Sequence, residues 1–522
     1  MDLFNFVIVG SGPSGVAAAR RLEGKGVCIV DVGMTPELSF PHQSLTKGLA
    51  SGNIETMLGA QWEMLANLVK PGQVHTKLRS PGARHVLNGK TFRVNDASGS
   101  TCLRDAGSYA AGGMSNVWGA QLFRYNDTDL AEVGDWPIDA GDLEPYYVDL
   151  EAHIGIAGMA DDMHHFLGET ENMLPPAPMV PAANYLLTKY AAQQRSQNFR
   201  LGRSRLAMMT KSYRGYPACE FGETDFFSTE STGIYTARRT LDELRAGGGV
   251  SYLGGYELVA YRESPEFVEI DLRHCDSNAT RTVRTKHLLL GCGTCQTARL
   301  VLLNKQAVGQ SLPFVDHPPT LIPLFIPRMF GASLPSHSTP VQLVASIEDH
   351  NQRDMISFYY PGGLLWSDLL ADMPLPVDVS LSVLPNLLGG MLVAQIWETS
   401  RPLPENRLSL DTTNSIVIDY PSRSSYARLG GLLKALRPLG VYSFQRLAIM
   451  TPPGWGFHHA ACLPMRRKPT DFETHVDGRL WDSQRVRIID GSVLPSLPAK
   501  NHSLTLMANA ARIAEETLRC GY

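Results

Sequence analysis

The first thirty residues contain the pattern that most restricts the fold of this chain. Residues 6–15 read FVIVGSGPSG, a helix is expected over residues 16–22, and residues 27–30 form a second apolar strand that ends at Asp31. The glycines of G-x-G-x-x-G allow a tight turn, close approach of a pyrophosphate and packing of the helix on the strand, and the helix N-terminus attracts phosphate. Asp31 stands 21 residues after Gly10, where a carboxylate can accept hydrogen bonds from an adenosine ribose. The motif predicts a dinucleotide site, without distinguishing NAD from FAD, at Gly10, Gly12, Pro13, Ser14, Gly15 and Asp31.

The C-terminal end of the chain carries a second group of candidate site residues. Residues 488–495 read IIDGSVLP and residues 501–505 read NHSLT, so an acidic residue, a polar pair and a new helix N-terminus follow one another. These features would close a pocket against the N-terminal turn. Because a dinucleotide fold that completes its site with its own C-terminus is typical of flavoproteins, we expect a flavin enzyme.

Length and charge set broad limits on organisation and partners. The 522 residues exceed what one simple core holds, which predicts two domains. A net charge of −4 gives no electrostatic reason to expect nucleic acid as a partner. The first strand begins too early to leave room for a signal peptide, no apolar run is long enough for a membrane span, and the eight cysteines are scattered. We therefore expect a soluble protein in the cytoplasm.

The middle of the chain alternates between small-residue loops and apolar strands. Residues 107–119 (GSYAAGGMSNVWG) are dense in small side chains, which lets the backbone approach a flat ligand closely. A helix is expected over residues 54–69, and strands are expected within residues 250–274 and over residues 286–291. Further strands are expected, in one mostly antiparallel sheet, over residues 321–326, 342–347, 355–360, 392–397 and 416–420.

Taken together, these segments resemble the glucose–methanol–choline (GMC) oxidoreductases, FAD-dependent enzymes that oxidise alcohols. The GGMS form of the loop at residues 112–115 is similar to that of the pyranose-oxidase-like and sugar-dehydrogenase branch. The segments that carry the resemblance are residues 10–31, 112–118 (GGMSNVW), 136–137 (WP), 143–147 (LEPYY), 316–318 (DHP), 458–465 (HHAACLPM) and 490–505.

The resemblance implies an α/β fold (α+β overall). A Rossmann-like FAD-binding domain would be combined with a substrate-binding domain built on a mostly antiparallel sheet. The FAD-binding domain would comprise residues 1–150, with a loop or lid region at about 40–95, residues 231–318, and residues 451–522 with the catalytic residues; the substrate domain would comprise residues 151–230 and 319–450.

The resemblance also implies the reaction: oxidation of an alcohol to a carbonyl on a sugar, glycoside or polyol. Hydride transfer to flavin N5 requires removal of the hydroxyl proton, for which a neutral histidine is suited. His458, seven residues before Met465, is the expected base, and His459 stays an alternative because Ala461 replaces the usual glycine. The second position is His502, three residues before Thr505, or Asn501.

The same resemblance assigns the cofactor-binding residues. Relatives with covalent flavin carry a histidine where this chain has Val117, so FAD is expected to be non-covalent. A helix beginning near Ser503 would direct its dipole at the reduced flavin. Besides the N-terminal turn, the flavin would be held by Gly112, Gly113, Met114, Ser115, Asn116, Val117, Trp118, Gly291, Asp490, Gly491 and Ser503.

Several alternatives stay open at this point. The electron acceptor is oxygen or a quinone-type compound, and the substrate could instead be a specialised biosynthetic intermediate, with lyase or isomerase chemistry. A silent FAD-binding subunit would have no need for His458 and His502. The CGTC run at residues 292–295 could be a redox pair, but we favour its interpretation as a small-residue turn. No metal site is expected, and residues 362–393 are interpreted as core strands with a covering loop or as an apolar lid.

Overall fold

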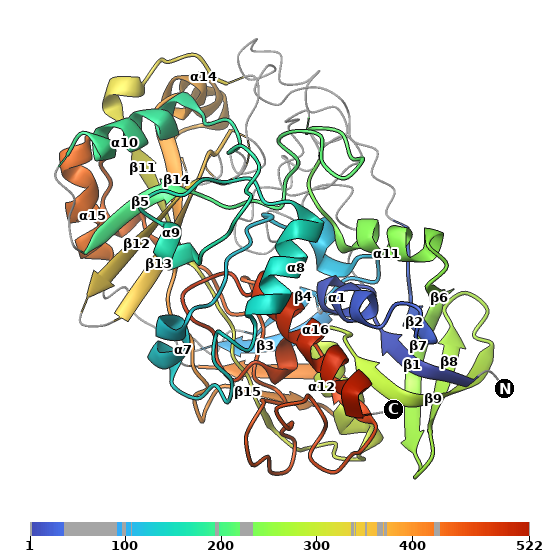
Figure 1. The fold of residues 1–522 in the computed structure, drawn as a ribbon. Coiled ribbons are helices and arrows are strands. Elements are labelled where there is room, and N and C mark those ends of the chain that lie inside the picture. Colours follow the sequence, from blue (N-terminus) through green and yellow to red (C-terminus); the bar gives the residue numbers. More distant parts are fainter. Residues whose placement is uncertain are drawn as a thin grey trace.

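The computed structural model describes three β-sheets with helices packed around them (Figure 1). The described residues are 3–35, 91–96, 101–105, 107–193, 198–219, 233–335, 339, 341–349, 352–362, 369, 373–421 and 428–520. The helix expected at residues 54–69 lies outside this set.

The first sheet is built around parallel strands from distant parts of the chain. Its strand order is β6-β2-β1-β9-β8-β7, and β18 also pairs with β9. The strands are β1 (Leu3–Val9), β2 (Val27–Asp31), β6 (Val250–Gly254), β7 (Tyr256–Glu263), β8 (Val268–His274), β9 (Thr280–Leu290) and β18 (Val486–Ile488). Parallel strands buried on both faces are continuously apolar, which is why residues 6–9, 27–30 and 288–290 could be predicted as strands.

Helices from both ends of the chain cover this sheet. Helix α1 (Pro13–Arg21) packs along α16 (Ser503–Cys520), and α8 (Glu144–Ile154) packs against α16 (Figure 1). Helix α11 (Ala237–Ala246) contacts α1 and β6, and α12 (Thr294–Asn304) contacts β7. The N-terminal and C-terminal segments therefore share one hydrophobic core.

The second sheet is antiparallel throughout, with strand order β17-β11-β14-β13-β12-β5. Alternate residues of its strands enter two different cores: Ile356 and Phe358 face α10 and α15, whereas Met355 and Tyr359 face the core that contains Val117. The elements are β5 (Phe199–Arg203), β11 (Thr320–Phe325), β12 (Val341–Asp349), β13 (Gln352–Tyr359), β14 (Met391–Trp397), β17 (Ile449–Met450), α10 (Pro181–Ala191) and α15 (Leu429–Leu436).

A third sheet corrects one prediction. Residues 416–420 do form a strand, β16, but it does not join the second sheet; it pairs with β15 and, in parallel, with β3. The apolar pattern of these residues predicts a strand without specifying its partner, and the partner lies more than three hundred residues earlier. The sheet order is β10-β15-β16-β3-β4, with β3 at Thr91–Asp96, β4 at Thr101–Asp105, β10 at Leu312–Pro313, β15 at Arg407–Leu410 and β16 at Ile416–Tyr420.

The apolar segment at residues 362–393 also differs from the prediction. Its described part contains a helix, α14 (Val377–Leu388), before β14, while residues 363–368 and 370–372 lie outside the described set. The expected domain boundaries stay a prediction. The remaining short elements are η3 (Gly113–Asn116), α7 (Asp127–Val133), α9 (His164–Leu167), η4 (Pro327–Met329), η5 (Arg437–Leu439), η6 (Gln445–Leu447) and η7 (Gly491–Val493).

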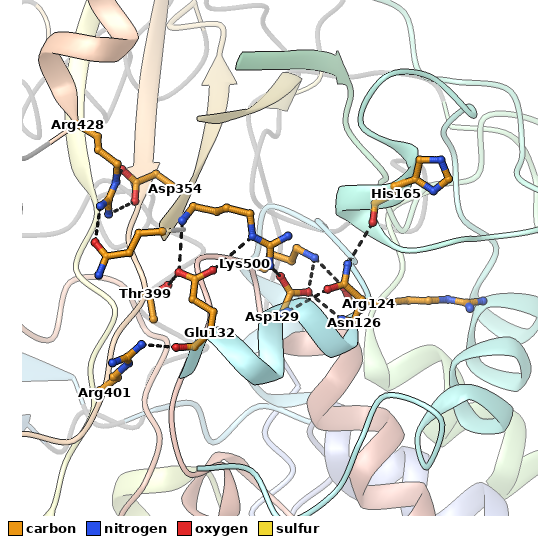
Figure 2. A network of polar contacts seen from close by, with 12 residues as sticks. Arg124, Asn126, Asp129, Glu132, His165, Asp354, Thr399, Arg401, Arg428 and Lys500 are labelled. Carbon is orange, nitrogen blue, oxygen red and sulfur yellow. Dashed lines mark hydrogen bonds and ion pairs between the residues drawn. The ribbon is translucent and has the colours of Figure 1, made fainter. Parts of the chain in front are cut away.

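A buried ionic network ties the second sheet to the C-terminal segment (Figure 2). Lys500 is fully buried, pairs with Asp129 of α7 and donates to the carbonyl oxygen of Arg124 at 3.3 Å. Asp129 also accepts from Arg353 of β13 at 2.8 Å, and Arg353 lies 3.4 Å from Glu132. Because a buried charge is costly unless it is paired, this network fixes β13, α7 and the residue before Asn501 relative to one another.

Substituting Asp129→Asn should lower the free energy of unfolding by about 3–5 kcal/mol, because it leaves Lys500 buried without its counter-charge. Chemical denaturation of the full chain measures this. The matched control is Arg262→Gln, which breaks an exposed pair with Asp271 and should change stability by less than about 1 kcal/mol. Equal effects of the two variants would contradict the role given to the network.

Candidate functional site

One cavity of about 280 Å³ lies beyond the C-terminal ends of β1, β2 and β9. Ligands of open α/β sheets bind at this edge. The cavity gathers segments from the whole length of the chain, including both segments that the sequence singled out. It is lined by residues 9–14, 30–32, 107–110, 113–115, 117–118, 256–258, 291–296, 299–300, 456–459, 490–491, 502–503 and 506.

The N-terminal glycine turn has the geometry that a pyrophosphate needs. Gly10 has φ +100°, and a Cβ there would overlap the carbonyl oxygen of Gly291. A Cβ on Gly15 would overlap the carbonyl oxygen of Gly10, so helix α1 can approach the turn this closely only with glycine. At Gly12 no atom lies within 4 Å of the position that a Cβ would occupy, and this face is open to the cavity. Pro13 opens α1.

Asp31 lies at the opposite wall of the turn, at the end of β2. Its carboxylate accepts a hydrogen bond from the Ser11 hydroxyl, which in turn accepts from the backbone N–H of Gly112 at 3.0 Å. Burial raises the pKa of Asp31 to about 6. Ser11 therefore connects the predicted ribose-binding acid to the predicted flavin loop, a role that sequence reasoning missed.

The loop at residues 111–118 is held by its own polar side chains. Asn116 donates to the carbonyl oxygens of Ala111 and Gly113 at 3.0 and 2.8 Å, and Ser115 donates to that of Gly112 at 2.6 Å. Gly112 and Asn116 do not line the described cavity, and their hydrogen bonds maintain the conformation of the loop. The cavity wall here consists of Gly113, Met114, Ser115, Val117 and Trp118.

In the described part of the chain, three α-helices begin at this cavity. The first residues of α1, α12 and α16 all line it, represented by Pro13, Thr294 and Ser503. The first N–H groups of a helix lack intrahelical partners, and the positive end of the dipole favours negative charge. The cavity is therefore suited to an anionic ligand with more than one charged group.

Asp490 connects two elements of the cavity wall through its hydrogen bonds. Its carboxylate accepts from the backbone N–H of Gly293 and of Ser492 at 3.0 Å each, and also from the hydroxyls of Ser492 and Thr297. Gly491 packs against the carbonyl oxygen of His459 so closely that a Cβ would overlap it. Asp490 thus joins β18 to the start of α12, and Gly291 joins β9 to the N-terminal turn.

His458 and His502 face each other in the wall of the cavity. Their ring centroids lie 4.7 Å apart with an interplanar angle of 73°. Burial lowers the pKa of His502 to about 4, so this ring is neutral at pH 7, and its Nδ1 has no hydrogen-bond partner among the described residues. Trp397 stacks on His458 with ring centroids 4.6 Å apart. On the same ring, Nδ1 of His458 lies 3.4 Å from Nδ1 of His317.

The two alternative residues occupy different environments. The His459 ring packs against Phe92 and Phe314, with centroids 5.9 and 5.3 Å away, and lies 3.6 Å from Asp316. Asn501 does not line the described part of the cavity. The geometry therefore favours His458 over His459 and His502 over Asn501. Ala461 has φ +67°, a left-handed conformation in which glycine is unstrained.

The CGTC run lies in the wall of the cavity. Cys292 and Cys295 are free thiols, and burial raises the pKa of both well above the ordinary value. A protonated thiol is a poor nucleophile, so this geometry favours a small-residue turn over a redox pair. Among the described residues no three His, Cys, Asp or Glu side chains are grouped closely enough to hold a metal ion, and no described helix has the length and apolar character of a membrane span.

Sequence reasoning also missed the polar and aromatic residues behind the histidines. His317 belongs to the DHP run, which the sequence indicates only as one of the segments that carry the resemblance, and Trp397 ends strand β14. A histidine beside a charged neighbour in sequence is the available signal for His317. Trp397 gives none, because a tryptophan at the end of an apolar strand is usually a core residue.

Comparison with known proteins supports the assignment of the C-terminal region. A family model described as GMC oxidoreductase, for the C-terminal part of that family, matches residues 449–510. The matched segment contains His458 and His502. No curated protein sequence matches the chain.

Solved structures give the fold. The structure of pyridoxine 4-oxidase from Mesorbium loti is similar to this chain with a TM-score of 0.61 and 13% sequence identity, over 99% of each chain. At this identity the similarity shows a shared fold. The predicted α/β fold class is confirmed, and the family match supports an oxidoreductase.

If FAD is the cofactor, as the sequence predicts, lowering the pH through about 6 should weaken its binding, because a protonated Asp31 cannot accept hydrogen bonds from ribose hydroxyls with both oxygens. The dissociation constant should rise by up to about tenfold per pH unit below that value. Fluorescence titration of the apoprotein with FAD between pH 5 and 8 measures this. Asp31→Asn should bind more weakly at pH 8 and lose this part of the pH dependence; identical profiles would contradict the assignment.

Proposed function

We propose that this chain is an FAD-dependent enzyme that oxidises an alcohol to a carbonyl compound. The observation that carries the proposal is that the facing pair His458 and His502 lines the same cavity as the glycine turn and Asp31. A dinucleotide cofactor and the histidine pair would then share one cavity. The GMC oxidoreductase match over residues 449–510 supports the same reaction class.

The residues present fit FAD in several respects. The open face of Gly12 and the start of α1 would receive the pyrophosphate, and Asp31 would accept from the ribose. The loop that includes Met114 and Val117 would lie against the isoalloxazine, and the N-terminus of α16 would stabilise negative charge on the reduced ring. Val117 has no nucleophilic atom, so the flavin would be bound without a covalent link.

The chain's own residues would handle the proton and the position of the alcohol. When bound, FAD would supply the hydride acceptor. His458 would accept the hydroxyl proton, which makes hydride departure from the same carbon favourable. His502 is neutral at pH 7 and could hold the hydroxyl oxygen by one hydrogen bond, so that the carbon is oriented before reaction. Asn501 stays the second candidate for this position.

The substrate class is inferred from the loop at residues 112–115 and from the solved structure of similar fold. The GGMS loop favours a sugar, glycoside or polyol, and this remains the prediction for the chain. Pyridoxine, named for the solved structure of similar fold, is a primary alcohol on an aromatic ring and belongs in the same test. Oxygen or a quinone-type compound would reoxidise the flavin.

Two other functions remain as alternatives. A specialised biosynthetic intermediate, with or without net oxidation, would use the same cavity. A silent FAD-binding subunit would not need a neutral, buried His502 facing His458, since burying Nδ1 of His502 with no hydrogen-bond partner among the described residues costs stability.

Substituting His458→Ala should leave FAD bound but slow flavin reduction by about 10²–10⁴-fold, the usual contribution of a general base. Anaerobic stopped-flow absorbance with sugars, glycosides, polyols, simple alcohols and pyridoxine measures this. The control His459→Phe places another aromatic ring against Phe92 and Phe314, and its flavin should be reduced at nearly the wild-type rate. The reverse result would make His459 the base.

Precipitating the holoprotein with trichloroacetic acid should release the flavin into the supernatant, because Val117 offers no atom for a covalent bond. The absorbance of pellet and supernatant measures this. Yellow colour retained in the washed pellet would mean that another residue holds the flavin covalently.

A further inference from the structure

His317 is a buried histidine that lies behind His458 and does not line the described cavity. Its Nε2 lies 2.6 Å from the carbonyl oxygen of Glu398, the residue that follows β14. A carbonyl oxygen can only accept, so Nε2 of His317 must carry a proton. Burial lowers the pKa of His317 to about 3, so the ring is neutral at pH 7 and its Nδ1 holds a lone pair.

That lone pair determines the protonation of the next ring. Nδ1 of His317 and Nδ1 of His458 lie 3.4 Å apart. With a lone pair on His317, the only proton that can occupy this contact is one on Nδ1 of His458. A neutral His458 then has its own lone pair on Nε2.

We propose that His317 is a positioning residue that fixes the tautomer of His458, so that Nδ1 carries the ring proton and Nε2 is the atom that accepts the substrate's hydroxyl proton. The inference rests on the proposed function for the role of His458 as base. The proton that leaves the alcohol oxygen bonds to Nε2 of His458, and none passes on to His317.

The surroundings hold both rings in this arrangement. Trp397 contacts His317 at 4.9 Å and stacks on His458 at 4.6 Å, so the end of β14 supplies both the ring beneath the pair and the Glu398 carbonyl. The aromatic face would also attract the cation formed when His458 is protonated.

The loop before His458 is pressed against the His317 backbone. A Cβ on Gly456 would overlap the carbonyl oxygen of His317, and the N–H of Gly454 donates to the carboxylate of Asp316. Phe457 has φ +54°, a strained conformation for a bulky residue. Strained backbone persists where the surroundings enforce it, and here it brings His458 to His317.

Two substitutions of His317 separate orientation from packing. His317→Phe keeps a ring against Trp397 but has no acceptor for His458. His317→Asn places an oxygen near the position of Nδ1 and can accept from His458, although it fills less space. Both variants lose the hydrogen bond to Glu398, so a loss of activity caused by that bond alone would appear in both. The Asn variant fills less space and should have the lower free energy of unfolding.

We expect His317→Phe to slow flavin reduction at saturating alcohol by about 10²–10⁴-fold with little change in KM, the loss that accompanies a misoriented histidine base. His317→Asn should recover about tenfold or more, as one hydrogen bond can supply. The flavin spectrum and FAD content should be unchanged in both. Wild-type reduction rates in His317→Phe, or a slower Asn than Phe variant, would overturn the proposal.

A second measurement does not depend on activity. ¹⁵N NMR of histidine-labelled protein, with the His458 signal assigned by its loss in His458→Ala, should show Nδ1 protonated and Nε2 unprotonated. In His317→Phe this preference should be lost. A wild-type His458 protonated on Nε2 would overturn the inference. If no alcohol reduces the wild-type flavin, the proposed function fails, while the NMR result still decides whether His317 fixes the tautomer.

Discussion

The register of three parallel strands is the constraint from which the site follows. Leu290 of β9 has Val9 of β1 as its partner on one side and Ile488 of β18 on the other. The residues that come next in each strand must therefore emerge side by side at one edge of the sheet. The glycine turn after β1, the turn that leads to α12 and the turn at Asp490 meet there for that reason. A slip of one residue in β18 would move Asp490 to the opposite face.

The hydrogen bonds across this edge maintain the arrangement. The N–H of Gly291 donates to Val9 and that of Ile489 to Leu290, each at 2.9 Å. The Asp490 carboxylate then satisfies the N–H of Gly293 at the start of α12. These bonds hold the ends of β1, β9 and β18 together, so the turns that follow the three strands stay side by side in the wall of the cavity. On the far side, the paired Lys500 and Asp129 anchor the segment that carries His502 to the second sheet.

Much of this could be predicted from the sequence, and the failures have identifiable causes. The parallel strands were evident because both faces are buried and their residues are continuously apolar. The pairing of β16 with β3 was not, since an apolar strand does not specify a partner in another part of the chain. His458 and His502 could be predicted as candidates through their motif, and the structure brings their rings together. Ser11, His317 and Trp397 act through contacts between distant segments, which residue type and spacing do not reveal.

The histidine cluster separates orientation of the base from its charge. In a base oriented by a carboxylate, the negative charge that holds the ring also favours its protonated form. Behind His458 the orienting group is instead a neutral imidazole, held neutral by burial and held in one tautomer by the Glu398 carbonyl. His502 in front is neutral for the same reason. Both neighbouring rings are neutral at pH 7, so neither adds a charge beside His458, and in the proposed arrangement the Glu398 carbonyl at the end of β14 determines which nitrogen of His458 receives the alcohol proton.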